Sequence, residues 1–184
     1  MLMAPATEAW TLDQVHRLPD DGNRYELLDG ELFVTPPPSP SHELLASRLR
    51  SILEPYVRQH HLGDLFGPRA VVRLLGAEVE PDLMIRTSVT AAPDSWDDMP
   101  VPLLVVEVLS RTTSRRDLVQ KRSYYRRIGV ADYWIVDGVT RTIRTVTATG
   151  EYDAVTGTEL VWQPRGAAEA LIVDVAAYFR GALG

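Results

Sequence analysis

The chain has 184 residues, of which 45% are hydrophobic and 24% are charged, as expected for a globular protein with one sizeable core. Its formal net charge of −6 disfavours a general nucleic-acid-binding protein, whose affinity comes largely from neutralising phosphates, but it leaves room for an enzyme with a local basic patch. The absence of cysteine excludes disulfides and thiolate metal sites and is typical of a cytoplasmic protein. Neither a membrane span nor a secretory signal is recognisable, so we expect no membrane association.

The N-terminal part of the sequence predicts a lead-in segment followed by a β-hairpin. Within the lead-in, residues 1–22, Thr11 is placed to cap a short helix. Asp29 and Gly30 separate two strand-like runs within residues 24–35, and such a pair between alternating apolar residues indicates a tight hairpin turn.

A run of prolines ends the hairpin, and a long helix is predicted after it. Ser41 precedes apolar residues at helical spacing, which predicts a helix over residues 42–60 with Pro55 as a point of kinking. A strand is then predicted over residues 68–75, and residues 87–100 form a polar loop that has room for a short helix.

The remaining pattern mixes strands and helices in one unit. We therefore expect a single α/β domain over residues 1–184, with its core in residues 24–140. The expected architecture is a mixed β-sheet with an N-terminal β-hairpin and C-terminal antiparallel edge strands. The later predicted elements are a helix over 115–128, strands over 131–136, 140–147 and 160–162, and a final helix over 175–182 capped by Asp174.

Two predicted strands, residues 80–85 and 103–108, carry acidic residues in otherwise apolar runs, at Asp82 and Glu107. An unpaired buried carboxylate is costly, so two such acids on successive strands suggest a shared site. Because side chains alternate along a strand, Glu107 shares a face with Val105 and is not solvent-facing by pattern. Each acid also has an ordinary interpretation: Asp82 as the cap of a turn, and Glu107 as a satisfied ion pair.

The helix that directly follows the Glu107 strand carries a lysine in the middle of its apolar stripe. The spacing of three, four and three residues indicates one helix face. Lys121 there either extends its ammonium past a buried stem to water or directs it toward the carboxylates of Asp82 and Glu107. The stripe consists of Leu118, Lys121, Tyr125 and Ile128.

Two carboxylates and a lysine at one sheet edge are suited to a metal-dependent phosphodiester site. Carboxylate oxygens are preferred ligands of Mg²⁺, which polarises a scissile phosphate and lowers the pKa of a bound water. Lys121 can orient or deprotonate that water, or neutralise charge developing on the phosphate. Arg111, Arg115 and Arg116 lie near the same strand end and can contact a nucleic-acid backbone, although a solvated helix start explains them equally well.

The ordered set of motifs resembles the Uma family of restriction-endonuclease-like proteins, which is part of the PD-(D/E)XK nuclease superfamily. The resemblance covers residues 24–140, most of the domain, and implies a restriction-endonuclease-like fold, a mixed β-sheet flanked by helices. Its motifs are Tyr-Glu-Leu-Leu-Asp-Gly-Glu from Tyr25, the proline-rich run into His42, Pro81-Asp82, Glu-Val-Leu-Ser from Glu107, Lys121 within Arg-Asp-Leu-Val-Gln-Lys-Arg-Ser-Tyr-Tyr, and Gly-Val-Ala-Asp-Tyr-Trp-Ile-Val-Asp from Gly129.

The resemblance implies Mg²⁺, with Mn²⁺ as the alternative ion, bound by Asp82, Glu107 and the main-chain carbonyl of Val108. It also implies DNA as the partner and a homodimer, because each site of such an enzyme cuts one strand. The sequence departs from the superfamily pattern at Leu109, where a lysine is expected two residues after the acid. Lys121, from the following helix, is the candidate replacement.

We therefore expect a cytoplasmic, Mg²⁺-dependent endonuclease that hydrolyses DNA phosphodiesters, with Asp82 and Glu107 holding the metal and Lys121 positioning the attacking water. Two residues are second-tier site candidates. His42, in the first turn of the predicted helix, can contact a phosphate or support the site from outside. Glu31 can reach the site from the hairpin or merely pair across it.

Two other functions stay open at this stage. A non-catalytic binding or assembly module on the same fold is favoured by the acidic net charge and by the missing lysine at position 109, and it predicts that the three main residues do not converge. A metal-dependent hydrolase of small phosphates suits the acidic charge and predicts a closed pocket in place of an open groove. Aromatic residues on the late strands are candidates for a dimer interface: Tyr133, Trp134 and Trp162.

Overall fold

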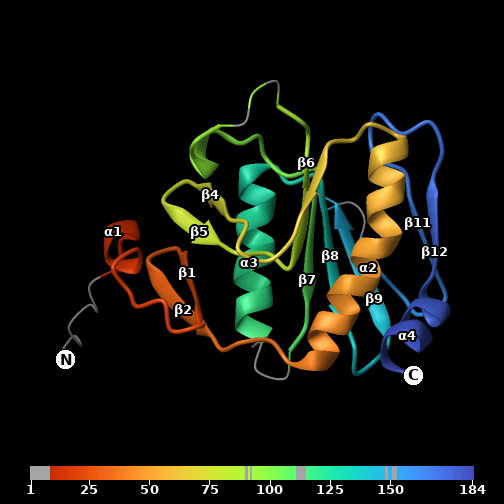
Figure 1. The fold of residues 1–184 in the computed structure, drawn as a ribbon, viewed down its shortest axis with the longest axis horizontal. Coiled ribbons are helices and arrows are strands. Elements are labelled where there is room, and N and C mark those ends of the chain that lie inside the picture. The colour runs from red at the N-terminus through yellow and green to blue at the C-terminus, as the bar shows by residue number, and fades with distance from the viewer. Residues whose placement is uncertain (1–8, 90, 92, 111–114, 148, 151–152) are drawn as a thin grey trace.

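The computed structural model describes residues 9–89, 91, 93–110, 115–147, 149–150 and 153–184, as a mixed α/β fold (Figure 1). Its helices are α1 (Leu12–Val15), α2 (Pro40–Gln59), the 3₁₀ turn η1 (Trp96–Asp98), α3 (Arg115–Ile128) and α4 (Val175–Leu183). Its strands are β1 (Arg24–Leu28), β2 (Glu31–Thr35), β3 (Asp64–Phe66), β4 (Val72–Leu74), β5 (Ala77–Val79), β6 (Leu83–Arg86), β7 (Leu104–Val108), β8 (Asp132–Asp137), β9 (Thr142–Thr147), β10 (Asp153–Thr156), β11 (Glu159–Trp162) and β12 (Leu171–Asp174).

The central sheet has the strand order β10-β9-β8-β7-β6-β3. Strands β7 and β8 run parallel and α3 connects them, as a parallel pair requires a crossover. The other neighbours in this sheet are antiparallel, so the sheet is mixed, as predicted. Figure 1 shows α3 on one face of this sheet and α2 with α4 on the other.

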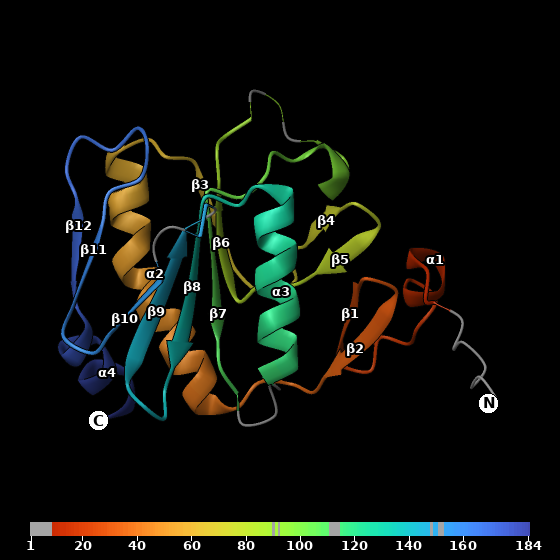
Figure 2. The ribbon, with the colours of Figure 1, turned by 180° about the vertical axis from the view of Figure 1, so that it is seen from behind.

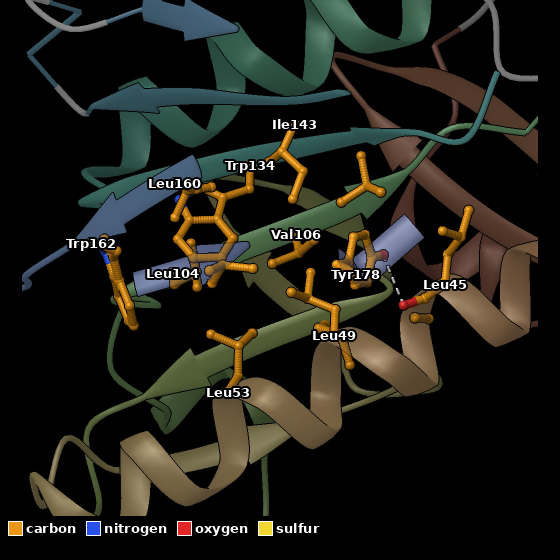
Figure 3. Close-up of a cluster of buried hydrophobic side chains, with 14 of the residues drawn as sticks. Leu45, Leu49, Leu53, Leu104, Val106, Trp134, Ile143, Leu160, Trp162 and Tyr178 are labelled. Atoms are coloured by element: carbon orange, nitrogen blue, oxygen red, sulfur yellow. Dashed lines mark hydrogen bonds between the residues drawn. The ribbon is translucent and has the colours of Figure 1, made fainter. Parts of the chain in front are cut away.

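The face covered by α2 and α4 carries the larger hydrophobic core. Figure 3 shows Leu49 and Leu53 of α2 directed at Val106 and Trp134 of the sheet. Leu49 and Leu53 are fully buried, which fits the apolar helical spacing seen in the sequence. Tyr178 of α4 fixes the two helices together, because its hydroxyl donates to the carbonyl of Leu45 at 3.0 Å.

The opposite face of the sheet packs against α3 and carries the functional residues. Side chains alternate across a strand, so Val105 and Tyr133 turn toward Tyr124 and Tyr125 of α3 while their sequence neighbours face α2. Glu107 follows Val105 by two residues and therefore lies on the α3 face. The alternation predicted from the sequence places this acid under α3.

A second sheet, in the order β2-β1-β5-β4, lies on the α3 side of the molecule (Figure 2). The β1–β2 hairpin turns at Asp29 and Gly30, both with positive φ of 51° and 78°, as a two-residue hairpin turn requires. Leu28 and Val79 from this sheet join the core under α3. The small sheet thus forms a wall beside α3 and beside the end of β7.

Three local predictions are corrected by the structure. Helix α2 begins at Pro40 with Ser39 as its N-cap, not at residue 42 after Ser41, because proline fits the first helical position and leaves no amide to satisfy. Strand β6 begins at Leu83, so Asp82 precedes the strand. The late strands β11 and β12 pair only with one another in a separate two-stranded sheet.

The proposed aromatic dimer interface is wrong. Tyr133, Trp134 and Trp162 are all buried in the fold, where Trp134 and Trp162 pack edge to face with ring centroids 5.4 Å apart. Their apolar area already stabilises the core and is not free for a partner. The homodimer itself stays a prediction. In the described part of the chain, no helix is both long and apolar enough to cross a bilayer.

Candidate active site

Asp82 lies in the short connection between β5 and β6, directly beside Glu107. The β6–β7 ladder pairs Leu83 with Val106, and continuing this antiparallel register by one residue sets Asp82 opposite Glu107. The backbone amide of Val108 donates to Oδ2 of Asp82 at 2.7 Å. Asp82 therefore bonds the end of β7, next to the second acid.

Two basic side chains from distant elements hold the Asp82 carboxylate. Arg24 donates to Oδ1 at 2.9 Å, and Nε2 of His42 lies 3.1 Å from Oδ2. Burial alone would raise the pKa of Asp82, but the His42 hydrogen bond and the Arg24 charge outweigh it and hold this pKa below its usual value. The acid is thus kept ionised inside the protein.

The second acid, Glu107, pairs with the lysine predicted for the site. Nζ of Lys121 lies 3.1 Å from Oε1 of Glu107, and the hydroxyl of Tyr125 donates to the same oxygen at 2.8 Å. Lys121 is 9% exposed, so its ammonium is not a snorkelling group in water. The apolar stripe seen in the sequence therefore placed both Lys121 and Tyr125 correctly.

Burial and nearby charges shift the pKa values of this pair. Burial raises the pKa of Glu107 to about 7, since the Lys121 charge, which lowers it, is opposed by the charges of Asp82 and Glu26. Burial alone would lower the pKa of Lys121, but the negative charges of Glu107 and Glu26 raise it above its ordinary value. Lys121 is consequently a fixed ammonium at neutral pH.

Sequence reasoning missed Glu26, which supplies a third carboxylate from β1. Its Oε1 accepts from Nζ of Lys121 at 2.8 Å and from the backbone amide of Glu80 at 2.7 Å. Arg24, also missed, lies two residues earlier on the same strand face. The signal was present, because Glu26 is an acid in an apolar strand just as Glu107 is.

The remaining predicted residues have different surroundings. His42 is 5% exposed and contacts Asp82, although its place in a first helical turn is more typical of a surface residue. Glu31 is exposed, and one of its oxygens accepts from Gln120 at 3.2 Å. None of the three predicted nucleic-acid contacts can be placed, because Arg111 and the side chains of Arg115 and Arg116 lie outside the described residues.

Two adjoining cavities open over this cluster. The smaller, of about 100 Å³, has Glu26, Glu107 and Lys121 at its polar end. The larger, of about 930 Å³, is lined by His42 and by the prolines that follow the hairpin. Both are open to solvent rather than sealed. They share four lining residues: Arg24, Thr35, Pro36 and Leu109.

The carboxylates at this site fit a hard divalent cation in their chemistry. Asp82 and Glu107 supply oxygen ligands of the kind that Mg²⁺ prefers. Burial, together with the charges of Asp82 and Glu26, raises the pKa of Glu107. Within the described residues, no three His, Asp or Glu side chains form a ready-made metal-ligating group, and Arg24 and Lys121 pair with the acids. Holding a cation means exchanging these ion pairs for metal–oxygen bonds.

The chain is similar to known proteins in sequence and in fold. Residues 12–175 match the model of the Uma2 family, which is described as "Putative restriction endonuclease". The fold is similar to the crystal structure of a "putative nuclease" from Anabaena variabilis, with a TM-score of 0.78 and 19% identity, covering 95% of this chain and 99% of that one. No curated protein matches the chain.

Proposed function

The chain belongs to the Uma2 restriction-endonuclease family, and from this premise we propose that it is a metal-dependent endonuclease that hydrolyses DNA phosphodiesters. The observation that carries the proposal is the burial of Lys121 against Glu107, with Nζ and Oε1 3.1 Å apart at an open cavity. A nuclease of this kind needs acids for a cation and a positive group for the phosphate, and Asp82, Glu107 and Lys121 supply both.

The composition of the chain supports a specific role for this lysine. Lys121 is the only lysine in the sequence, and all other members of the 19 Lys and Arg residues are arginines. An ammonium is compact and carries three rotatable donors, whereas a guanidinium is a planar fork. A chain that uses arginine at every other basic position, yet places lysine at this buried one, indicates that the site requires an ammonium.

The sequence allowed Lys121 either to take a proton from the attacking water or to act only as a hydrogen-bond donor. Its raised pKa favours the second role. A lysine that stays protonated cannot accept a proton from water, so Lys121 acts as a donor. Nζ can donate a hydrogen bond to a lone pair of the attacking water and so orient it, and it can neutralise charge that develops on the phosphate. Glu26 holds Nζ in place at 2.8 Å, so the ammonium needs little reorganisation during the reaction.

In this proposal, two of the acids in the cluster hold the cation. Asp82, Glu107 and the carbonyl of Val108 are the proposed ligands, with Mg²⁺ or Mn²⁺ as the ion. When bound, the ion polarises the phosphate and lowers the pKa of a bound water. Arg24 and His42 keep Asp82 ionised, and both line the larger cavity, where they can meet phosphate oxygens of the DNA.

The geometry also bears on the two rival functions. The non-catalytic module was expected to leave the three main residues apart, whereas Lys121 meets Glu107 and Asp82 bonds the neighbouring amide of Val108. The small-phosphate hydrolase was expected to have a closed pocket, whereas the two cavities are open and adjoin one another. The first observation favours a catalytic site, and the second favours a polymeric substrate.

Cleavage of single-stranded, partly paired and fully paired DNA tests the proposal. The native protein is incubated with DNA and Mg²⁺ or Mn²⁺, beside Glu107→Gln and Lys121→Met. Glu54→Gln, on α2, changes a partly exposed residue that pairs with Arg58 at the surface, and it is the matched control. We expect metal-dependent cleavage by the native protein and the control, and a loss of at least a hundredfold in the two site variants. Equal cleavage by Glu107→Gln, or no cleavage by the native protein with either ion, would overturn the proposal.

A further inference from the structure

We infer that the smaller cavity is a pocket for one unpaired nucleobase, so that the substrate is DNA with an unpaired nucleotide at the cleavage position. The inference rests on the proposed function, because it places the base beside the phosphodiester on which Glu107 and Lys121 would act. It concerns the walls of the cavity, which the proposed chemistry leaves without a role.

The residues that line the cavity are partly ionic and partly apolar. Leu28 lies on β1 two residues beyond Glu26, and Leu118 lies on α3 one turn before Lys121, while Val79 contributes from β5. The elements that supply site residues therefore also supply hydrocarbon surface beside them. A water-filled groove for phosphate alone gains nothing from such walls, whereas a flat apolar group stacks favourably between them.

Phe33 supplies an aromatic ring to the same cavity. In the β1–β2 ladder it lies directly opposite Glu26, so the two side chains are neighbours on one sheet face. Phe33 is only half-buried, which leaves part of the ring free. Aromatic side chains beside a nucleic-acid site act as stacking platforms for bases, and they do so for any base sequence.

The size of the cavity suits one base. An apolar cavity of about 150 Å³ takes up one benzene ring. This cavity has a volume of about 100 Å³ and is open to solvent, so it is on the scale of a single ring. It is too small for a base pair.

The larger cavity offers a path for the backbone on either side of that base. It joins the smaller one through Arg24, Thr35 and Pro36, and it continues past Ser39 and His42. Arg24 lines both cavities, so its guanidinium is placed to meet a phosphate or base oxygen where they join.

A paired base cannot enter this pocket, because it is held within the stack of the duplex. Bases reach enclosed sites only when they are already unpaired or are turned out of the helix at a cost of a few kcal/mol. A chain with a net charge of −6 also gains little from tracking the phosphates of a duplex. These conditions favour single strands, bulges and similar structures over fully paired DNA.

Binding without divalent cations tests the inference independently of cleavage. Fluorescence anisotropy in EDTA compares a single-stranded oligonucleotide, a duplex with one unpaired nucleotide, and the fully paired duplex of the same sequence. We expect the first two to bind at least fivefold more tightly than the paired duplex. A 2-aminopurine at the unpaired position should change its fluorescence on binding, because it leaves the DNA stack and enters the pocket.

Variants of Phe33 connect that preference to the pocket. Phe33→Ala should weaken binding of unpaired substrates roughly five- to a hundredfold and leave the paired duplex unaffected. Phe33→Leu preserves apolar volume without the aromatic ring and covers the case in which the alanine variant folds poorly. Val161→Ala, an exposed residue of β11, is the control for general loss of surface apolar groups.

The outcomes separate this inference from the proposed function. Equal affinity for paired and unpaired DNA, or binding that is unchanged by both Phe33 substitutions, would overturn the base pocket. Cleavage of fully paired DNA that does not depend on Phe33 would also overturn it, while leaving the endonuclease standing. Phe33-dependent binding by a protein that cleaves no DNA would support the pocket and contradict the proposed function alone.

Discussion

Oε1 of Glu26 lies 2.8 Å from Nζ of Lys121 and joins the first strand of the hairpin to the helix that follows β7. The same oxygen accepts from the amide of Glu80, so the backbone of the small sheet fixes its position. Glu26 touches Lys121 and not the proposed reacting atoms, which makes it a positioning residue for the ammonium.

Replacing Glu26 by glutamine should therefore lower kcat more than it changes KM. The amide can still accept a hydrogen bond, but it no longer balances the charge of Lys121 or fixes its direction. We expect a loss of roughly ten- to a hundredfold in cleavage rate, as for other residues that orient a reacting group. Steady-state kinetics measures it, and Glu26→Asp should recover part of the rate. A variant with native kcat would show that Glu107 alone positions Lys121.

Lys121 should also contribute strongly to stability. Lys121→Met leaves the buried carboxylates of Glu26 and Glu107 without their cation, and breaking a buried pair in this way costs about 3–5 kcal/mol. Arg122→Met is the matched control on the next residue, because Arg122 pairs with Asp153 at the surface and such pairs contribute about 0–1 kcal/mol. Urea denaturation of both variants gives the comparison. Equal losses for the two would contradict the buried pairing.

The core between α2 and the sheet gives a further stability prediction. Leu49 is fully buried against the sheet (Figure 3), so Leu49→Ala should cost about 2–5 kcal/mol through lost burial and the cavity that remains. Leu44, on the same helix, is 54% exposed, and Leu44→Ala should change the free energy of unfolding by about 0.5 kcal/mol or less. Thermal or urea unfolding distinguishes them, and similar effects would refute the assigned helix face.

The raised pKa of Asp132, a residue away from the site, predicts that the free energy of unfolding depends on pH. Asp132 accepts from Nε1 of Trp162 at 3.0 Å, and burial raises the pKa of Asp132 more than this hydrogen bond lowers it. The folded protein thus binds the proton at a higher pH than the unfolded chain does. The cost of burying the charge is present above the folded pKa and disappears as pH falls toward the unfolded value of 3.8.

Asp132→Asn keeps the hydrogen bond to Trp162 and removes the titration. Its advantage in free energy of unfolding over the native protein should be largest near pH 7 and should shrink as the pH is lowered toward 4. Urea denaturation of both proteins at a series of pH values measures this difference. An advantage that is constant with pH, or that grows in acid, would contradict the raised pKa.

Much of the fold could be predicted from local patterns, because helices, hairpin turns and caps depend mainly on residues that are close in sequence. The helix over 115–128 has the bounds predicted from its apolar stripe, and the Asp29–Gly30 hairpin and the Asp174 cap are confirmed. The start of α2 was misplaced because Ser39 and Ser41 are both plausible caps, and only the proline at position 40 decides between them.

The site was predicted only in part, because the sequence pattern indicates contacts between consecutive elements but not contacts that depend on tertiary packing. Glu107 and Lys121 are 14 residues apart on consecutive elements, so their approach follows from the strand-to-helix order. Glu26 and Arg24 reach the cluster from β1, and that contact depends on how the small sheet packs against α3. Nothing in the local sequence fixes such packing. Glu26 was missed, although it is an acid within an apolar strand, as Glu107 is.

The metal site is the central claim, and a calorimetric titration with Mn²⁺ tests it most directly. The native protein is compared with Asp82→Asn and Glu107→Gln, and with Asp153→Asn as a surface control. We predict one binding event for the native protein and the control, weakened at least tenfold in both site variants. Absence of binding to the native protein, or binding that neither substitution changes, would contradict the assignment of these carboxylates as metal ligands.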